Sequence, residues 1–268
     1  MIRLGNKLDG VIVVKLGGST LGSHDTSILD IVDLQKQSKP VVMVHGGGKI
    51  ITEWLKKQSI ASNFVQGERV TDKATLEVVI SVLAGLVNKE LVASINNQGG
   101  RAVGISGIDG ALIEGKIKNI ELGYVGTVEK VNLDPLEILL QAGYIPVIAP
   151  IGLCMETGLD REPQLLNINA DLVAGEIAAA LGSEELVFLT DVAGICNQQG
   201  ELLPQLLPEE AESLMASGVA SGGMIPKIKA CLRALSNASS ASIIDGRQPH
   251  ALLNEIKGNH TGTVIKGG

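Results

Sequence analysis

The chain has 268 residues, of which 45% are hydrophobic and 19% charged, so it is globular with an ample core rather than disordered. The net charge of −7 argues against nucleic acid and anionic membranes as general partners, and aromatic residues, at 2%, are too few to stack single-stranded bases. Residues 1–10 lack the apolar core of a signal peptide and no apolar run reaches membrane-spanning length, so we expect a cytoplasmic protein.

Short β-branched runs alternate with longer helical patterns along the chain. The runs that end in glycine or polar residues predict strands at residues 11–16, 41–44, 102–105, 145–149, 186–190 and 241–244. Each run is continuously apolar, which is typical of a parallel sheet that is covered on both faces by helices.

Three segments carry apolar residues at helical steps. They predict helices at residues 71–97, 169–181 and 224–235, the first beginning at Thr71-Asp72. The alternation of strands and helices predicts an α/β fold with an open, mostly parallel, doubly wound sheet in an αβα sandwich. Residues 120–131 alternate around Gly123 and Gly126 and predict an antiparallel hairpin beside the sheet. We expect two closely joined lobes, residues 1–180 and 181–268.

Glycines gather where two predicted strands end, at Gly17-Gly18 and at Gly46 to Gly48. Ligands of open α/β sheets bind at the carboxyl ends of the strands, and glycine lets backbone N–H groups approach an anion closely. One such turn is weak evidence, because tight turns need glycine anyway. Two turns at equivalent places favour an anion site, although the chain has neither a Walker motif nor G-x-G-x-x-G after a strand.

Four charged residues stand out near these turns. Lys15 lies inside an apolar strand, which is costly unless it meets an anion or extends to solvent from an edge strand. Lys227 follows two glycines near the start of a helix. Asp171 begins an apolar helix, where it could simply favour the helix dipole, and Arg69 could be a solvated loop residue.

Histidine and cysteine patterns indicate no protein metal site. His45 ends a buried strand, where a general base is conceivable but a packed histidine is favoured. The four histidines and the three widely spaced cysteines, Cys154, Cys196 and Cys231, have neither zinc-like spacing nor a disulfide framework.

Ten ordered motifs carry a resemblance to a known family. They are VVKLGG (13–18), VHGGGK (44–49), QGERVTD (66–72), LVNKEL (86–91), GISGIDG (104–110), YVGTVEKVN (124–132), LNINAD (166–171), LTDVAG (189–194), GGMIPK (222–227) and IDGRQPHALL (244–253). With them the chain resembles the amino-acid kinase family from residue 11 to residue 265, and within it the branch that phosphorylates N-acetyl-L-glutamate in arginine biosynthesis.

The resemblance implies roles for single residues. Lys15 and Lys227 would be the cations on the transferring phosphoryl group, and Asp171 would orient both. The acetylated amino acid would be held by Gly47, Gly48, Arg69 and Asn167. ATP, with Mg²⁺ bound mainly to its phosphates, would be bordered by Gly17, Gly18, Asp191, Val192, Gly194, Cys196, Val219, Ala220 and Ser221. The lobe at residues 1–180 would then bind the acid and form the dimer, and the lobe at 181–268 would bind ATP.

The implied reaction fits the chemistry of these side chains. A side-chain carboxylate, with a pKa of about 4.3, is already an anionic nucleophile at neutral pH, so no general base is required. The task is to bring two anions together, which calls for fixed cations and backbone donors. Ile108 and residues 160–164 depart from the commonest family pattern and bear on substrate choice.

Two other functions are compatible with the family pattern. One is a kinase for aminoadipate or glutamate attached to a carrier protein in lysine biosynthesis, which would favour a longer, basic hairpin than residues 114–127 provide. The other is a nucleotide-binding sensor without catalysis, against which the joint presence of Lys15, Asp171 and Lys227 argues.

The assembly can also be anticipated. Only residues 1–10 precede the first predicted strand, and ten residues span about 15 Å as a helix, too short to link dimers into a hexameric ring. We therefore expect a homodimer that free arginine does not inhibit, with residues 71–97 as a candidate two-fold surface.

Overall fold

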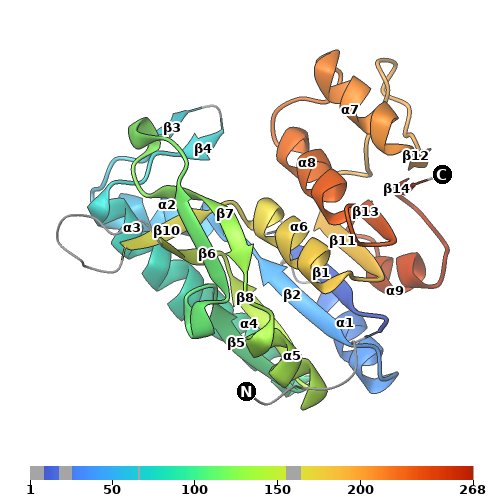
Figure 1. Ribbon diagram of the computed structural model, residues 1–268, viewed down its shortest axis with the longest axis horizontal. Helices are drawn as coiled ribbons and strands as arrows, with labels where there is room; N and C mark the ends of the chain where they lie inside the picture. The colour runs from blue at the N-terminus through green and yellow to red at the C-terminus, as the bar shows by residue number, and fades with distance from the viewer. Residues whose placement is uncertain (1–8, 18–25, 66, 155–163, 268) are drawn as a thin grey trace.

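A single eight-stranded sheet forms the centre of the computed structural model, which describes residues 9–17, 26–65, 67–154 and 164–267 (Figure 1). Its strand order is β12-β14-β13-β11-β1-β2-β8-β5, and all the registered pairs are parallel except β13 with β14. The strands are β1 (Ile12–Leu16), β2 (Val41–His45), β5 (Ala102–Ser106), β8 (Ile145–Ala149), β11 (Glu185–Thr190), β12 (Gln205–Leu206), β13 (Ser240–Asp245) and β14 (Thr263–Ile265). The expected mostly parallel α/β sheet is confirmed.

Helices cover both faces of this sheet, as Figure 1 shows. One face packs against α5 (Asp134–Gln141), α6 (Ala170–Leu181), α7 (Pro208–Ala216) and α8 (Met224–Ala234). The other packs against α1 (Ser27–Lys36), α2 (Gly48–Lys57), α3 (Lys73–Ile80), α4 (Asn88–Asn97) and α9 (Ala251–Ile256). Val13 belongs to the first core and Val14 to the second, because successive strand residues point to opposite faces. This alternation places Lys15 on the face of α6.

The sheet is continuous across the expected lobe boundary near residue 180. β1 pairs in parallel with β11, with Ile12 opposite Glu185, so strands from both sides of the boundary are neighbours at the middle of the sheet.

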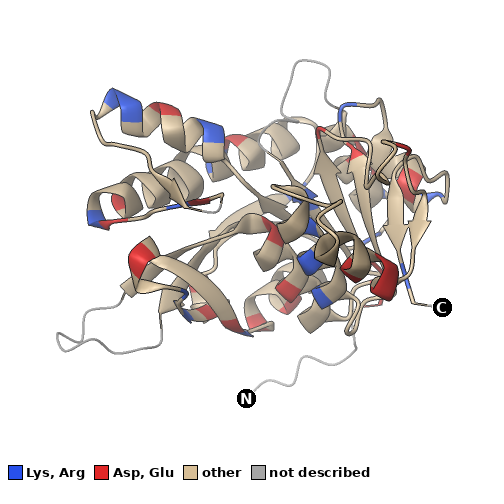
Figure 2. Cartoon of the chain, turned by 90° about the horizontal axis from the view of Figure 1, so that it is seen from above, with Lys and Arg blue, Asp and Glu red and all other residues tan. Residues whose placement is uncertain are grey.

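Charged residues of both signs are interspersed along the helices in the view of Figure 2.

The long helix expected over residues 71–97 is present from Lys73 to Asn97, but it is not regular. Asp72 caps α3 by accepting a 2.8 Å hydrogen bond from the N–H of Thr75. A π-helical turn, Ser81–Val87, separates α3 from α4. The combined helix, Lys73–Asn97, has a mean hydropathy of 1.8 and is long and apolar enough to cross a membrane, so the expectation that no segment reaches that length is wrong. Its buried apolar residues, from Val78 to Ile95, pack into the core beside α1 and α2, as in a core helix.

A second, smaller sheet stands beside the main one. β6 (Ile113–Ile117), β7 (Val125–Val131), β9 (Ile151–Cys154) and β10 (Gln164–Ile168) close into a four-stranded barrel. The expected hairpin exists, but it joins β6 to β7, and Ile120–Leu122 form a 3₁₀ turn rather than a strand. Ile120 is 89% exposed. It matches the alternating apolar pattern of a strand in the sequence, although its side chain is not buried. A two-stranded ribbon, β3 (Phe64–Val65) with β4 (Glu68–Arg69), completes the described sheets.

Candidate active site

Lys15 is the centre of the site. It lies in β1 between β11 and β2, opposite Phe188 and Val44, and only 8% of the residue is exposed. A lysine extending to solvent from an edge strand is therefore excluded. Its ammonium lies 2.7 Å from Oδ1 of Asp171, so the buried charge is compensated by an anion.

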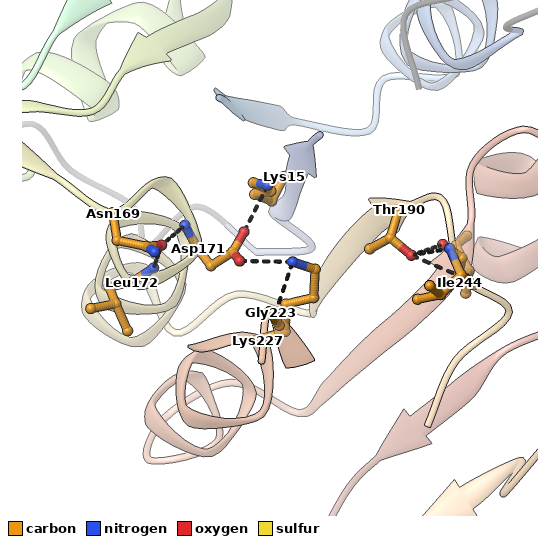
Figure 3. Close-up of polar contacts among 9 residues, drawn as sticks. Lys15, Asn169, Asp171, Leu172, Thr190, Gly223, Lys227 and Ile244 are labelled. Carbon is orange, nitrogen blue, oxygen red and sulfur yellow. Dashed lines mark hydrogen bonds and ion pairs between the residues drawn. The ribbon is translucent and has the colours of Figure 1, made fainter. Parts of the chain in front are cut away.

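Asp171 is held in place by the start of α6 (Figure 3). Asn169 caps this helix, since its side-chain oxygen accepts hydrogen bonds from the N–H groups of Asp171, at 2.8 Å, and Leu172, at 3.4 Å. Such a cap is worth about 1 kcal/mol and directs the first-turn side chain. The second carboxylate oxygen, Oδ2, accepts a 3.0 Å hydrogen bond from Lys227 in α8, which also contacts the carbonyl of Gly223 at 3.3 Å.

The two lysines therefore converge on one carboxylate from different parts of the chain. Burial by itself raises the pKa of Asp171, but the charges of Lys15 and Lys227 and their hydrogen bonds outweigh it and hold the pKa below its ordinary value. Asp171 is thus ionised at neutral pH and fixes two ammonium groups next to each other. This arrangement can stabilise negative charge that develops nearby.

A cavity of about 230 Å³ opens beside this triad. It brings together most of the residues that were predicted from the sequence to act in catalysis or to bind the acid substrate. The predicted residues that line it are Lys15, Gly47, Gly48, Arg69, Asn167 and Asp171. The further lining residues include Gly46, Phe64, Glu68, Leu83 and Asn169.

Arg69 is buried rather than solvated, with 8% of the residue exposed, and burial lowers the pKa of its guanidinium below the ordinary value. Its Nη2 donates to the carbonyl of Gly48 at 3.0 Å and to Oγ1 of Thr52 at 2.9 Å, and its Nη1 donates to Ser62. The guanidinium also stacks on the ring of Phe64, 4.7 Å from its centroid. These contacts hold a planar cation on the wall of the cavity.

Asn167 comes from β10 of the small barrel and reaches the same wall. Its Nδ2 donates to Oγ1 of Thr71 at 3.0 Å, and the Thr71 hydroxyl donates to the carbonyl of Arg69 at 2.8 Å. Thr71 is fully buried. The side-chain amide of Asn167 is therefore linked through one hydroxyl to the backbone of Arg69, 98 positions earlier in the sequence.

Of the residues predicted to border the nucleotide, those that the structure describes lie after β1, after β11 and before α8, and they do not line this cavity. Gly17 donates its N–H to the carbonyl of Leu189 at 3.2 Å, whereas Gly18 lies outside the described residues. Asp191 and Val192 are exposed, Gly194 is buried, and Cys196 is half-buried. Ala220 is buried and Ser221 exposed, and Val219 lines a separate cavity of about 600 Å³ between α7 and residues 197–206.

Several residues of the site carried no clear signal in the sequence. Thr52 and Ser62 hold Arg69, and Thr71 connects it to Asn167, but isolated hydroxyl residues are common in loops and helix ends. Asn169 could have been found, because an asparagine immediately before an apolar helix is a frequent cap. Within the described ranges, no group of three or more His, Cys, Asp or Glu side chains is placed to hold a metal ion.

Comparisons with known proteins agree with this geometry. The family model described as "Amino acid kinase family" matches residues 10–245. A protein of Dehalococcoides mccartyi named acetylglutamate kinase is 48% identical over 257 residues, covering 96% of this chain and 94% of its own. A protein of the same name from Cereibacter sphaeroides is 46% identical over 261 residues, covering 96% of this chain and 87% of its own.

A solved structure shares the fold. The structure of smu.665 from Streptococcus mutans superposes with a TM-score of 0.82 at 26% identity, covering 96% of this chain and 99% of that one. The relatives that share the name acetylglutamate kinase confirm the branch that the motifs indicated. On the evidence of the family model, the relatives and the shared fold, the chain belongs to the amino acid kinase family.

Proposed function

We propose that this chain is an ATP-dependent kinase that phosphorylates the side-chain carboxylate of N-acetyl-L-glutamate to N-acetyl-L-glutamyl 5-phosphate, a step of arginine biosynthesis. The observation that carries the proposal is the convergence of Lys15 and Lys227 on Asp171 beside a cavity that Arg69 and Asn167 also line or reach. Relatives named acetylglutamate kinase at 46–48% identity support the substrate.

In the proposed mechanism, a carboxylate oxygen of the acid forms a bond to the γ-phosphorus while the bond from that phosphorus to the bridging oxygen breaks. The electron pair of the broken bond leaves with ADP, and no proton has to be removed from the nucleophile. Lys15 and Lys227 stabilise the charge on the phosphoryl oxygens, and Asp171 keeps the two ammonium groups in position. Gly47 and Gly48 line the same cavity, and their backbone N–H groups are the proposed donors to the phosphoryl oxygens.

The nucleotide is proposed to lie against Gly17, Gly18, residues 191–196 and residues 219–221, with the acid held by the segment before residue 180. Mg²⁺ would neutralise the phosphate oxygens and would be held mainly by them. Gly17 and residues 191–196 follow β1 and β11, at the edge of the sheet where ligands of open α/β sheets bind, and residues 219–221 precede α8.

A homodimer in the cytoplasm is the proposed working form. The long helix Lys73–Asn97 supports the two-fold contact, since less than half of its most apolar window is buried inside one chain. The relatives' shared name indicates a biosynthetic enzyme.

The function is tested by trapping acyl phosphates as hydroxamates with ATP, Mg²⁺ and a panel of acids. We expect N-acetyl-L-glutamate to turn over well above free glutamate, aspartate and N-acetyl-aminoadipate. A preference for any other acid would contradict the proposal, and ATP binding without turnover of any acid would favour the nucleotide sensor.

Replacing Arg69 by alanine is expected to raise the KM for the acid roughly 10- to 100-fold with a smaller change in kcat. The reason is that a guanidinium pairing with the substrate's other carboxylate contributes about 1.5–3 kcal/mol to binding in the ground state. Steady-state kinetics with varied acid at saturating ATP measure both constants.

The matched control is Arg101→Ala. Arg101 also stacks on an aromatic ring, 4.5 Å from the centroid of Tyr144, but it is exposed and does not line the cavity. Its KM for the acid should stay within about twofold of the unmodified enzyme. An unchanged KM in Arg69→Ala would show that Arg69 does not bind the acid.

A further inference from the structure

His45 is buried at the end of β2, directly before the glycine turn of the cavity, and has no place in the mechanism above. Only 1% of the residue is exposed, and its Nδ1 lies 3.0 Å from the carbonyl oxygen of Gly46. A carbonyl can only accept, so Nδ1 carries the proton and donates. Nε2 is then left without a proton and must accept a hydrogen bond.

Asn88 supplies that hydrogen bond. Its Nδ2 lies 2.9 Å from the carbonyl of Val147 in β8, 3.2 Å from Nε2 of His45 and 3.3 Å from the carbonyl of Ile105 in β5, so the amide group shares its two hydrogens among three acceptors, of which Ile105 is the most distant. Its Oδ1 accepts from the Lys89 ammonium at 2.9 Å, and because an ammonium only donates, the orientation of the amide is determined. Asn88 is fully buried, so the orientation of the imidazole ring is set by the interior of the protein and not by solvent.

The hydrogen bond to Gly46 has a consequence for Gly47. The described chain contains no cis peptide bond, and in a trans peptide the C=O and the following N–H point in opposite directions. When His45 holds the Gly46 carbonyl on the buried side, the N–H of Gly47 faces away from His45. Gly46, Gly47 and Gly48 line the cavity, and a Cβ on Gly46 would lie 4.0 Å from the ammonium of Lys15.

The π-helical turn Ser81–Val87 supports the same glycine. A Cβ on Gly47 would lie 2.7 Å from Cδ2 of Leu83 and 3.5 Å from Cγ2 of Val87, both from this turn. A π turn adds a residue to the helix and so rotates the next helical turn about the axis, and Asn88 is the first residue of that next turn. Gly104 leaves room for Asn88, because a Cβ there would lie 2.0 Å from its Oδ1.

We propose that His45 and Asn88 are positioning residues for the phosphoryl transfer, which orient the Gly46–Gly47 peptide so that the N–H of Gly47 faces the cavity beside Lys15. The proposal rests on the proposed function of that cavity and deepens it. It assigns His45 a structural hydrogen bond, not proton transfer to or from the substrate.

The electrostatic surroundings agree with a neutral imidazole. Burial, together with the charges of Lys15 and Lys89, lowers the pKa of His45 to about 4, although the hydrogen bond to Gly46 by itself raises this pKa. The ring is therefore uncharged at neutral pH. We expect no ionisation of His45 in the pH profile of kcat between pH 6 and pH 9.

The test compares replacements that keep different atoms of the imidazole. Asparagine places an amide N–H near the position of Nδ1, whereas glutamine reaches toward Nε2 and leucine fills the volume without a donor. We expect His45→Leu and His45→Gln to lose roughly 10- to 100-fold in kcat/KM for the acid, and His45→Asn to stay within about fivefold of the unmodified enzyme.

Each alternative role predicts another order of activities. If His45 only packs, leucine will be as active as asparagine or more so, and if it is a general base, asparagine will be as inactive as leucine. Either result overturns the proposal. His250→Leu is the matched control, because the His250 side chain is 54% exposed and pairs with Asp30 away from the cavity. Its kcat/KM should be unchanged.

Two further measurements cover the remaining outcomes. If His45→Leu does not fold, Asn88→Ala removes the donor to Nε2 and should lower kcat/KM roughly tenfold, and an unchanged value overturns the proposal. A crystal structure of a His45 variant needs no turnover: we expect the Gly46–Gly47 peptide of the leucine variant to rotate, and an unmoved peptide refutes the positioning role. Absence of turnover in the unmodified chain would instead contradict the proposed function.

Discussion

Replacing Lys227 by methionine is expected to lower kcat roughly 100- to 1,000-fold while the KM for the acid changes by less than about threefold. Methionine keeps the length and the apolar stem of the side chain but removes the ammonium that contacts Oδ2 of Asp171 at 3.0 Å. A cation that acts on charge developing in the transition state contributes little to ground-state binding, so the loss falls on kcat.

The helix that carries Lys227 offers its own control. Lys229 lies two residues further along α8 and is exposed, so Lys229→Met removes one charge from the same helix without touching the triad. Its kcat should remain within about twofold of the unmodified enzyme. A loss of kcat in both variants would indicate a general effect of charge or of helix stability, and an active Lys227→Met enzyme would remove Lys227 from the mechanism.

The central strands were predictable from sequence because they are buried on both faces. In β8 the continuous apolar run Ile145–Ala149 has the observed bounds, and β1 and β11 differ from the expectation by one residue at the start. Their flanking glycines and aspartates mark the carboxyl edge of the sheet, which is where the site lies. The expectation that Lys15 either meets an anion or extends to solvent followed from the cost of burying a charge, and the position of β1 inside the sheet decides between the two.

The strands of the small barrel could not be predicted from the sequence in the same way. Its strands mix buried and half-exposed residues, and β10 of this barrel pairs in parallel with β7 and antiparallel with β9. Such pairings join segments far apart in the chain and leave no local periodicity. Because Ile120 is apolar but exposed, the sequence pattern placed the start of the predicted hairpin at residue 120, whereas β7 begins at Val125.

Around the site, too, some contacts could be predicted from the sequence and others could not. Asp171 and Asn169 belong to one short motif, so their roles could be anticipated. The contact between His45 and Asn88 joins residues 43 positions apart, and it depends on a π turn that no apolar spacing distinguishes from a regular helix. The burial of Arg69 likewise depends on Ser62 and Thr52, which only the tertiary fold brings to it.

Asp171→Asn is expected to lower both activity and stability, because Asp171 is the one carboxylate that contacts both lysines among the described residues. The asparagine keeps the shape but leaves the buried Lys15 ammonium without its anion, 2.7 Å away, which costs roughly 3 kcal/mol. The kcat should fall about 100-fold or more, since the two ammonium groups then repel each other and move apart. Urea unfolding and steady-state kinetics measure the two effects.

The pH dependence of stability gives a second measurement of the same carboxylate. The folded pKa of Asp171 lies below its ordinary value of 3.8, so its pairing contributes fully above that value and is lost as the pH falls through the folded pKa. The difference in unfolding free energy between the unmodified enzyme and Asp171→Asn should be constant from pH 5 to pH 8 and shrink below pH 4. Glu176→Gln on the same helix removes a partly exposed pair with Arg233 and should cost less than about 1 kcal/mol. If the two variants lost equal stability, the buried triad would not be the source of the effect.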